Sequence, residues 1–146
     1  MRIIAGRYKS RRLRGDLPEG IRPTSDRLRE TLFNILSNRI IESVFLDAYA
    51  GVGGVGLEAI SRGASMVYFV DRSAKACGMI RSNLKTLEIC DGHSILNMDL
   101  DVAIRKCQET NVRFDIAFLD PPYHRKDLYE RDLERFSSGN LLLSNG

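Results

Sequence analysis

The segment Asp120-Pro121-Pro122-Tyr123 combines groups that could handle an exocyclic amine on a base. Such an amine is a weak nucleophile because its lone pair is delocalised into the ring. The carboxylate of Asp120 and the carbonyl of Pro121 could accept its two N–H bonds and stabilise the positive charge that develops on nitrogen. The prolines stiffen the segment, and Tyr123 offers a ring for stacking an extruded base. The segment therefore indicates methylation of an amine, against a simpler interpretation as a Pro-stiffened turn with a surface Tyr.

A second candidate is the loop Gly51-Val52-Gly53-Gly54-Val55-Gly56, which contains G-x-G-x-x-G. Glycines at these positions let the backbone approach a ligand and turn tightly into a following helix. Asp71 stands 20 residues beyond Gly51, where a carboxylate could accept both hydroxyl protons of a ribose. The loop and Asp71 fit either a dinucleotide or S-adenosylmethionine, and a purely structural tight turn is the alternative.

Asp47 indicates which of these two ligands fits the loop, because it is an acidic residue four positions before the first glycine. A pyrophosphate would be repelled by this carboxylate, whereas the ammonium of a methionine moiety would be attracted. Asp47 could also brace the loop by accepting backbone N–H bonds, and the two roles are compatible. Asp99 could accept from the adenine amino group, although its neighbours Asn97 and Asp101 could do so too, or could cap the next helix.

Four apolar runs alternate with helical patterns, and the runs themselves do not alternate with polar residues. This pattern predicts an α/β fold with a mostly parallel sheet covered by helices on both faces. The first helix is expected to start at 22–26, with Thr24 as its cap, and to bury Leu28, Leu32, Ile35 and Leu36. The expected strands are 44–49, 66–70, 94–98 and 115–119, and the later helices 57–62, 73–87, 100–110 and 128–136.

The charge of the chain is unevenly placed, which points to a polyanionic partner. Residues 1–29 carry nine Lys or Arg against three acids, a net +6, so the rest of this +3 chain carries −3. A basic arm that is merely solvated is the alternative. The candidates for contact with nucleic acid are Arg7, Lys9, Arg11, Arg12, Arg14 and Arg22.

The remaining composition excludes several classes of protein. The three cysteines are widely spaced, without a Cys-x-x-Cys pair or a nearby His cluster, so neither a disulfide framework nor a zinc site is expected. No stretch approaches the length of an apolar membrane span, and the N-terminus turns basic and polar at once. We expect a cytoplasmic monomer that binds no metal and no membrane.

Six segments of the chain, taken in order, match one bacterial family. The matching segments are Arg2-Ile3-Ile4-Ala5-Gly6, Arg22-Pro23-Thr24-Ser25-Asp26-Arg27, Arg29-Glu30-Thr31-Leu32-Phe33-Asn34-Ile35-Leu36, Asp47-Ala48-Tyr49-Ala50-Gly51-Val52-Gly53, Gly56-Leu57-Glu58-Ala59 and Asp120-Pro121-Pro122-Tyr123. Together they resemble the RsmD-like methyltransferases, which act on guanine N2 of the small-subunit (16S) ribosomal RNA. The Arg-Pro-Thr and Asp-Pro-Pro-Tyr segments are fairly specific, whereas the glycine loop is shared by most methyltransferases of this fold.

The resemblance implies a Rossmann-like class I fold, S-adenosylmethionine as methyl donor, and ribosomal RNA in a small-subunit particle as partner. It implies that Asp120 and Tyr123 act on the target guanine, and these two together with Pro121 are the expected catalytic residues. The expected cofactor-binding residues are Thr24, Asp47, Tyr49, Gly51, Gly53, Asp71 and Asp99. The family usually has Glu where Asp71 stands, and Phe is common where Tyr49 stands.

The expected domains are a basic N-terminal arm over residues 1–22 and a C-terminally short class I methyltransferase domain over residues 23–146. Family members continue into a further strand and a terminal hairpin. Without them, strand 115–119 would be an exposed edge, and the chain would be less stable than a version extended by those strands.

Three other functions fit parts of the pattern. An amine methyltransferase could act on adenine N6 in DNA or on a glutamine amide in protein. A nicotinamide-dependent oxidoreductase would explain the glycine loop and Asp71, but it leaves Asp120 to Tyr123 unexplained. A non-catalytic RNA-binding module would explain only the basic residues.

Overall fold

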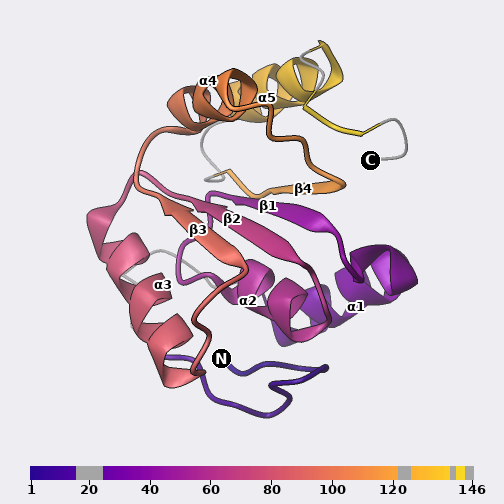
Figure 1. Ribbon diagram of the computed structural model, residues 1–146, viewed down its shortest axis with the longest axis vertical. Helices are drawn as coiled ribbons and strands as arrows, with labels where there is room; N and C mark the ends of the chain where they lie inside the picture. The colour runs from indigo at the N-terminus through magenta and orange to yellow at the C-terminus, as the bar shows by residue number, and fades with distance from the viewer. Residues whose placement is uncertain (16–24, 122–125, 139–140, 144–146) are drawn as a thin grey trace.

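The computed structural model describes residues 1–15, 25–121, 126–138 and 141–143 of the chain. A four-stranded parallel sheet forms its centre, in the order β3-β2-β1-β4. Two helices cover one face of this sheet and three cover the other (Figure 1). The strands are β1 (Val44–Ala48), β2 (Met66–Val70), β3 (His93–Leu96) and β4 (Ile116–Leu119). The helices are α1 (Asp26–Leu36), α2 (Gly54–Ser61), α3 (Ala74–Thr86), α4 (Leu100–Glu109) and α5 (Lys126–Ser138), with the 3-10 helix η1 (Ser37–Ile40) after α1.

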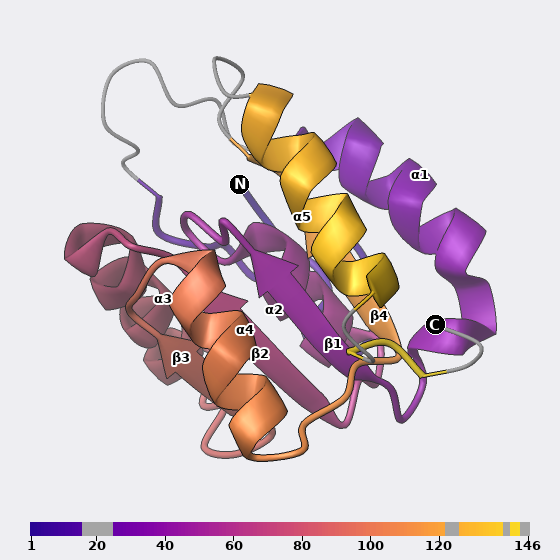
Figure 2. The same cartoon turned by 90° about the horizontal axis from the view of Figure 1, so that it is seen from above.

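Two apolar clusters hold the helices on the sheet, one on each face. Side chains of α1, α2 and α3 pack on one face against Phe45 and Phe69. Side chains of α4 and α5 pack on the other face against Leu46 and Val70, and Figure 2 shows these two helices lying over the strands. The alternation of strand side chains between two buried faces explains why the apolar runs carry no polar alternation. The predicted fold class is confirmed.

The first helix differs from its predicted form at both its start and its buried face. Ser25 is the N-cap, its side chain accepting a hydrogen bond from the Leu28 backbone N–H at 3.2 Å, so the prediction of Thr24 as cap is wrong. Leu28 and Ile35 are 56% and 75% exposed, and the buried side chains are instead Arg29 and Phe33. The helix therefore buries a different face from the predicted one. Arg29 has a charged partner in the interior, and Phe33 stacks on Phe45, which lies in the sheet.

The second helix begins at Gly54, three residues earlier than predicted. The first N–H groups of a helix have no partner within the helix and need an acceptor from outside. Asp47 supplies one, because its carboxylate accepts the Gly56 N–H at 2.8 Å. The glycine-rich loop therefore passes directly into α2.

Residues 1–15 form an irregular hairpin packed on α2 and α3. An antiparallel bridge joins Arg2 to Arg12, and the side chains of Ile3 and Leu13 are buried. This basic segment is thus attached to the body of the protein through apolar side chains as well as hydrogen bonds.

None of the helices in the described part of the chain is long and apolar enough to cross a membrane.

The segment Leu141–Leu143 runs parallel to the chain that enters β4. The Phe114 N–H donates to the Leu141 carbonyl at 2.8 Å, and the Leu143 N–H donates to the Phe114 carbonyl at 3.0 Å. In the described residues, this bridge therefore pairs the chain just before β4, and β4 itself is an end strand of the four-stranded sheet.

Candidate cofactor and amine site

The carboxyl ends of the four strands form one rim that carries four acidic residues. The register pairs Ala48 of β1 with Val70 of β2 and with Leu119 of β4, so the residues that follow these strands lie at one level. The sheet order places the acids along the rim in an order that differs from their order in the chain. From one side to the other they are Asp99, Asp71, Asp47 and Asp120.

Asp71 links the glycine-rich loop to the turn after β2. One carboxylate oxygen accepts the Gly51 N–H and the other accepts the Ser73 N–H, both at 2.8 Å. Gly51 and Gly53 have φ of +56° and +78°, values that favour glycine. Each oxygen of Asp71 has accepted one hydrogen bond and retains a lone pair, so the ribose contact predicted for Asp71 is compatible with its structural role.

Asp47 is a buried carboxylic acid at the centre of the rim. It is 2% exposed, and its carboxylate accepts the Gly56 N–H. Burial, reinforced by the negative charges of Asp120 and Asp71 and opposed by that hydrogen bond, raises the pKa of Asp47 to about 8. The predicted bracing role is therefore present in the structure. A raised pKa also means that a cation arriving beside this group would favour its ionised form.

Gly56, the last glycine of the pattern, allows α2 to lie close to the sheet. A Cβ at this position would come within 2.3 Å of the Phe69 ring, whereas a Cβ at Gly51 would meet no atom within 4 Å. Open space above Gly51 and close packing below Gly56 are the two conditions that a ligand-binding loop of this kind needs.

Two further cofactor candidates have different surroundings. The hydroxyl of Tyr49 donates to Asp132 of α5 at 2.6 Å. Burial raises the pKa of Tyr49, and this hydrogen bond raises it further. Asp99 is exposed at the N-cap position of α4, with no capping bond from its side chain. The amide of Asn97 donates to the carbonyls of Asp71 and Arg72, both at 3.0 Å.

Of the three residues considered for adenine, Asn97 has its NH2 group bound to backbone carbonyls, and Asp101 is paired with Arg135 and Arg131 of α5. Asp99 is the exposed carboxylate among them. The cofactor contacts of Tyr49 and Asp99 stay predictions.

The segment that the sequence predicts to handle the amine begins directly after β4. Asp120 is exposed and Pro121 is half-buried, next to β1 and its Asp47. Tyr123, Thr24 and Arg22 lie outside the described residues. Within the described ranges, no cluster of three or more His, Cys, Asp or Glu could hold a metal ion.

The basic candidates of the N-terminal hairpin lie on its surface. The Arg11 guanidinium donates to the Thr86 carbonyl at the end of α3 at 3.0 Å, and the Arg7 guanidinium lies over the Tyr8 ring, 5.5 Å from its centroid. The exposed members of the set are Arg7, Lys9, Arg11, Arg12 and Arg14.

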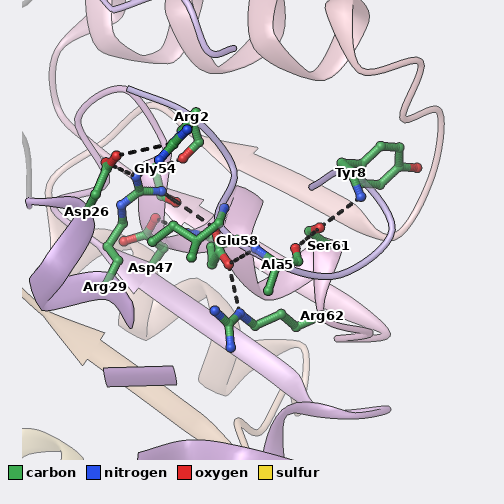
Figure 3. Close-up of polar contacts among 12 residues, drawn as sticks. Arg2, Ala5, Tyr8, Asp26, Arg29, Asp47, Gly54, Glu58, Ser61 and Arg62 are labelled. Atoms are coloured by element: carbon green, nitrogen blue, oxygen red, sulfur yellow. Dashed lines mark hydrogen bonds and ion pairs between the residues drawn. The ribbon is translucent and has the colours of Figure 1, made fainter. Parts of the chain in front are cut away.

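Arg29 is a site-supporting residue that the sequence did not reveal. Figure 3 shows its guanidinium, which is fully buried, pointing toward Asp26 at 2.6 Å and toward Glu58 at 3.7 Å. It also donates to the backbone carbonyls of Gly54 at 3.3 Å and Arg2 at 2.9 Å. Arg29 thus joins α1, the N-terminal hairpin and the first turn of α2, where the glycine-rich loop ends.

Glu58 is the matching buried acid of this network. Its carboxylate accepts the N–H groups of Ile4 and Ala5 at 2.8 and 3.0 Å and pairs with Arg62 at 2.7 Å. One feature of the sequence could have indicated this network. Glu58 is the single charged residue of the mostly apolar helix α2, and a charged residue requires a partner when it is buried.

Comparisons with known proteins agree with this geometry. The family model described as conserved hypothetical protein 95 matches residues 1–146. The chain is 37% identical over 145 residues to the ribosomal RNA small subunit methyltransferase D of Haemophilus influenzae, covering 99% of this chain and 75% of that protein. It is 35% identical over 146 residues to the Escherichia coli protein of the same name, covering 100% of this chain and 68% of that protein.

Solved structures match as well. The yhhF protein of Escherichia coli superposes with a TM-score of 0.83 at 34% identity, covering 98% of this chain and 75% of that one. SMU.776, solved in complex with SAH, shares the fold at a TM-score of 0.70 and 18% identity, covering 82% of this chain and 33% of that one. The fold is that of the class I S-adenosylmethionine-dependent methyltransferases, and the chain belongs to the conserved hypothetical protein 95 family, that of the ribosomal RNA small subunit methyltransferases D.

Proposed function

We propose that this chain transfers the methyl group of S-adenosylmethionine to the exocyclic N2 amine of a guanine in small-subunit (16S) ribosomal RNA. The relatives named above support methyl transfer and a small-subunit ribosomal RNA acceptor. The observation that carries the proposal is the adjacency of β1 and β4, because it brings Asp120 and Pro121 beside Asp47 and the glycine-rich loop.

The cofactor half of the site fits S-adenosylmethionine better than a dinucleotide. Asp47 is a buried acid in the place where a dinucleotide would put its pyrophosphate, and an ammonium there would supply the cation that this carboxylate lacks. Gly51 leaves open space for the ligand, and Asp71 retains lone pairs for a ribose. When bound, the cofactor supplies an electrophilic methyl carbon on a sulfonium.

The acceptor half of the site belongs to Asp120 and Pro121. Their oxygens accept the two N–H bonds of the amine, so that the lone pair of nitrogen faces the methyl carbon in line. Asp47, Asp71 and the glycine-rich loop would hold the cofactor, which would supply its methyl group to that nitrogen. The nitrogen becomes positive and then loses one proton, and Asp120 stabilises that charge and is placed to take the proton.

The test incubates the purified chain with labelled S-adenosylmethionine and either small ribosomal subunits, naked 16S RNA, DNA or protein. Mass mapping of digested RNA identifies the modified base, and N2-methylguanosine is the expected product. Methylated adenine or glutamine would replace the proposed acceptor with one of the two alternatives.

Variants of the acid test the role of the site. Asp120→Ala is expected to keep binding of S-adenosylhomocysteine and to lose most turnover. Glu109→Ala removes an exposed acid from the end of α4 and serves as the matched control, with unchanged turnover expected. Equal turnover of Asp120→Ala and the parent would refute the role of this carboxylate. Salt-sensitive RNA binding without methyl transfer by either protein would indicate a non-catalytic module.

A further inference from the structure

We propose that the outward face of α3, centred on Arg81 and Lys85, is a second RNA-contact surface that extends the basic N-terminal hairpin. This inference rests on the proposed function and adds to it the surface that holds the ribosomal RNA during the reaction. Neither residue belongs to the basic segment that the sequence singles out, and their importance comes from where the fold places α3.

Helix α3 has one face in the core and one face in solvent. Its inner face buries Ile80 and Leu84, and its outer face exposes Gly78, Arg81 and Lys85 at a spacing of three and then four residues. Residues at this spacing lie in one row along a helix. A Cβ at Gly78 would meet no atom within 4 Å, so this row faces open space.

The same helix touches the candidate site at its other end. Its N-cap, Ser73, donates its N–H to Asp71 at the rim, and a Cβ at Gly53 would lie 3.0 Å from Ile80. The amide of the fully buried Asn83 donates to the Val52 carbonyl at 3.2 Å. RNA that lies along α3 would therefore continue toward the rim.

The N-terminal hairpin is attached along α3, which brings two basic elements together. The Arg14 N–H donates to the Asn83 side chain at 2.7 Å, and Asn83 donates back to the Arg14 carbonyl at 2.9 Å. The Arg11 guanidinium donates to the Thr86 carbonyl at the last turn of α3. Figure 1 shows the hairpin running beneath α2 toward the far end of α3. The arginines of the hairpin thus lie beside the C-terminal half of α3, which carries Arg81 and Lys85.

The charge of α3 distinguishes it from the helix on the opposite face of the sheet. Helix α3 carries three cations and no acid within Ala74–Thr86, whereas α4 carries Arg105 and Lys106 together with Asp101 and Glu109. Phosphate groups are attracted to a surface on which Lys and Arg have no acidic neighbours. A surface with equal numbers of cations and acids gives no such net attraction.

Acidic residues set the limit of the proposed surface. Glu88 and Asp91 are exposed in the loop that follows α3. Glu88 lines the same surface depression as Arg81 and Lys85, and Asp91 lines a second depression with Glu88. The two acids would repel an RNA backbone, so the contact is assigned to Arg81, Lys85 and the hairpin.

Gly78 allows a test that does not weaken the fold. Gly78→Glu places a carboxylate three residues before Arg81 in open space, and Gly78→Gln adds the same bulk without charge. Both changes replace a helical glycine with a better helix former, so neither should reduce stability. In a salt titration of 16S RNA binding, Gly78→Glu is expected to raise the Kd about tenfold at low salt, with Gly78→Gln equal to the parent.

Removal of the cations gives the complementary measurement. The double variant Arg81→Ala with Lys85→Ala should reduce the slope of log affinity against log salt by about 1.4, since each single-strand phosphate contact contributes about 0.7. Arg105→Ala with Lys106→Ala is the matched control on α4 and should leave the slope unchanged. Methyl transfer by the α3 variant should show a raised KM with kcat retained, and calorimetric binding of S-adenosylhomocysteine should not change.

The two proposals fail in different ways. If the parent methylates 16S RNA and the α3 variants bind and react as it does, the α3 surface is refuted and the proposed function stands. If the parent binds RNA through α3 without methylating it, the proposed function is refuted and the surface stands. Equal weakening by the α3 and α4 double variants also refutes the surface, and so does a parent that binds no RNA.

Discussion

Replacing Asp47 with Asn should stabilise the protein in a manner that depends on pH. The substitution keeps the shape of the side chain, and the amide oxygen can still accept the Gly56 N–H that the carboxylate accepts at 2.8 Å. What disappears is the titration of a buried acid. Because the pKa of Asp47 is raised to about 8 from its ordinary 3.8, mainly by burial, the folded and unfolded states bind protons differently over that whole range.

The sign and size follow from these two values. Above about pH 4 the unfolded chain loses this proton while the folded protein keeps it, so the free energy of unfolding of the parent falls as the pH rises toward 8. The slope is about 1.4 kcal/mol per pH unit, and the accumulated penalty at pH 7 is about 4 kcal/mol. This is a large part of the 5–15 kcal/mol or so that is typical of a folded domain.

The assay is urea denaturation of the ligand-free proteins at pH 5, 6, 7 and 8. The difference in free energy of unfolding between Asp47→Asn and the parent should grow with pH and level off near pH 8. The control is Asp91→Asn, an exposed position where no such growth is expected. Parallel pH profiles for Asp47→Asn and the parent would refute the assignment of Asp47 as a buried, protonated acid.

Two further substitutions test the packing that supports the site. Gly56→Ala should lower the free energy of unfolding by about 1–3 kcal/mol, because its Cβ would overlap side chains of β2. The control Gly78→Ala, in open space, should leave the free energy of unfolding unchanged or raise it by up to about 1 kcal/mol. Equal effects of the two substitutions would contradict this account of the packing. Arg29→Met should lower the free energy of unfolding by about 3 kcal/mol, since it leaves the buried Glu58 without one of its cations. The substitution Arg27→Met, at an exposed position, is its control. A decrease below about 0.5 kcal/mol for Arg29→Met would show that the network is dispensable for stability.

The fold class and the rim of acids could be predicted because they depend on local patterns. Continuous apolar runs such as Met66–Val70 have few uses other than a strand buried on both faces. The carboxyl ends of parallel strands share one edge of the sheet. Asp71 and Asp120 come directly after two of these strands, so their place at that edge could be predicted. The boundaries of those strands moved by one or two residues, which changes neither conclusion.

The orientation of α1 could not be predicted from periodicity, because both of its faces are partly apolar. Leu28 and Ile35 match a helical repeat as well as Phe33 does, and they are exposed. The choice depends on Arg29, whose burial is favourable only when Glu58, 29 residues later in the chain, lies opposite to it. A pairing of this kind belongs to the tertiary structure and leaves no local pattern.

The candidate site was predictable in its composition but not in its hydrogen bonds. Asp71 and Asp47 stand where the spacing put them, and both also hold backbone N–H groups of the glycine-rich loop. The bond from Tyr49 to Asp132 joins residues 83 positions apart and could not be inferred from the loop sequence. In each case the predicted residue has a structural partner that sequence spacing does not encode.

Whether Asp47 only braces the loop or also receives the cofactor can be decided by counting protons. With a pKa of about 8, Asp47 is mostly protonated at pH 7 in the ligand-free protein. An ammonium placed beside this carboxyl favours its ionised form, so binding of S-adenosylhomocysteine at pH 7 should release a proton from it. A ligand that never approaches Asp47 should release none from it.

Calorimetry in two buffers with different ionisation enthalpies measures this release directly, because the observed binding enthalpy changes by the buffer enthalpy multiplied by the protons released. The parent should show a difference between the buffers that corresponds to proton release, and Asp47→Asn, which has no proton to lose at this position, should show almost none. The variant should also bind more weakly, because it lacks the charge that attracts the ammonium. Equal proton release by the two proteins would leave Asp47 with the bracing role alone, and the acid that costs the folded protein stability would then have no ligand to compensate for it.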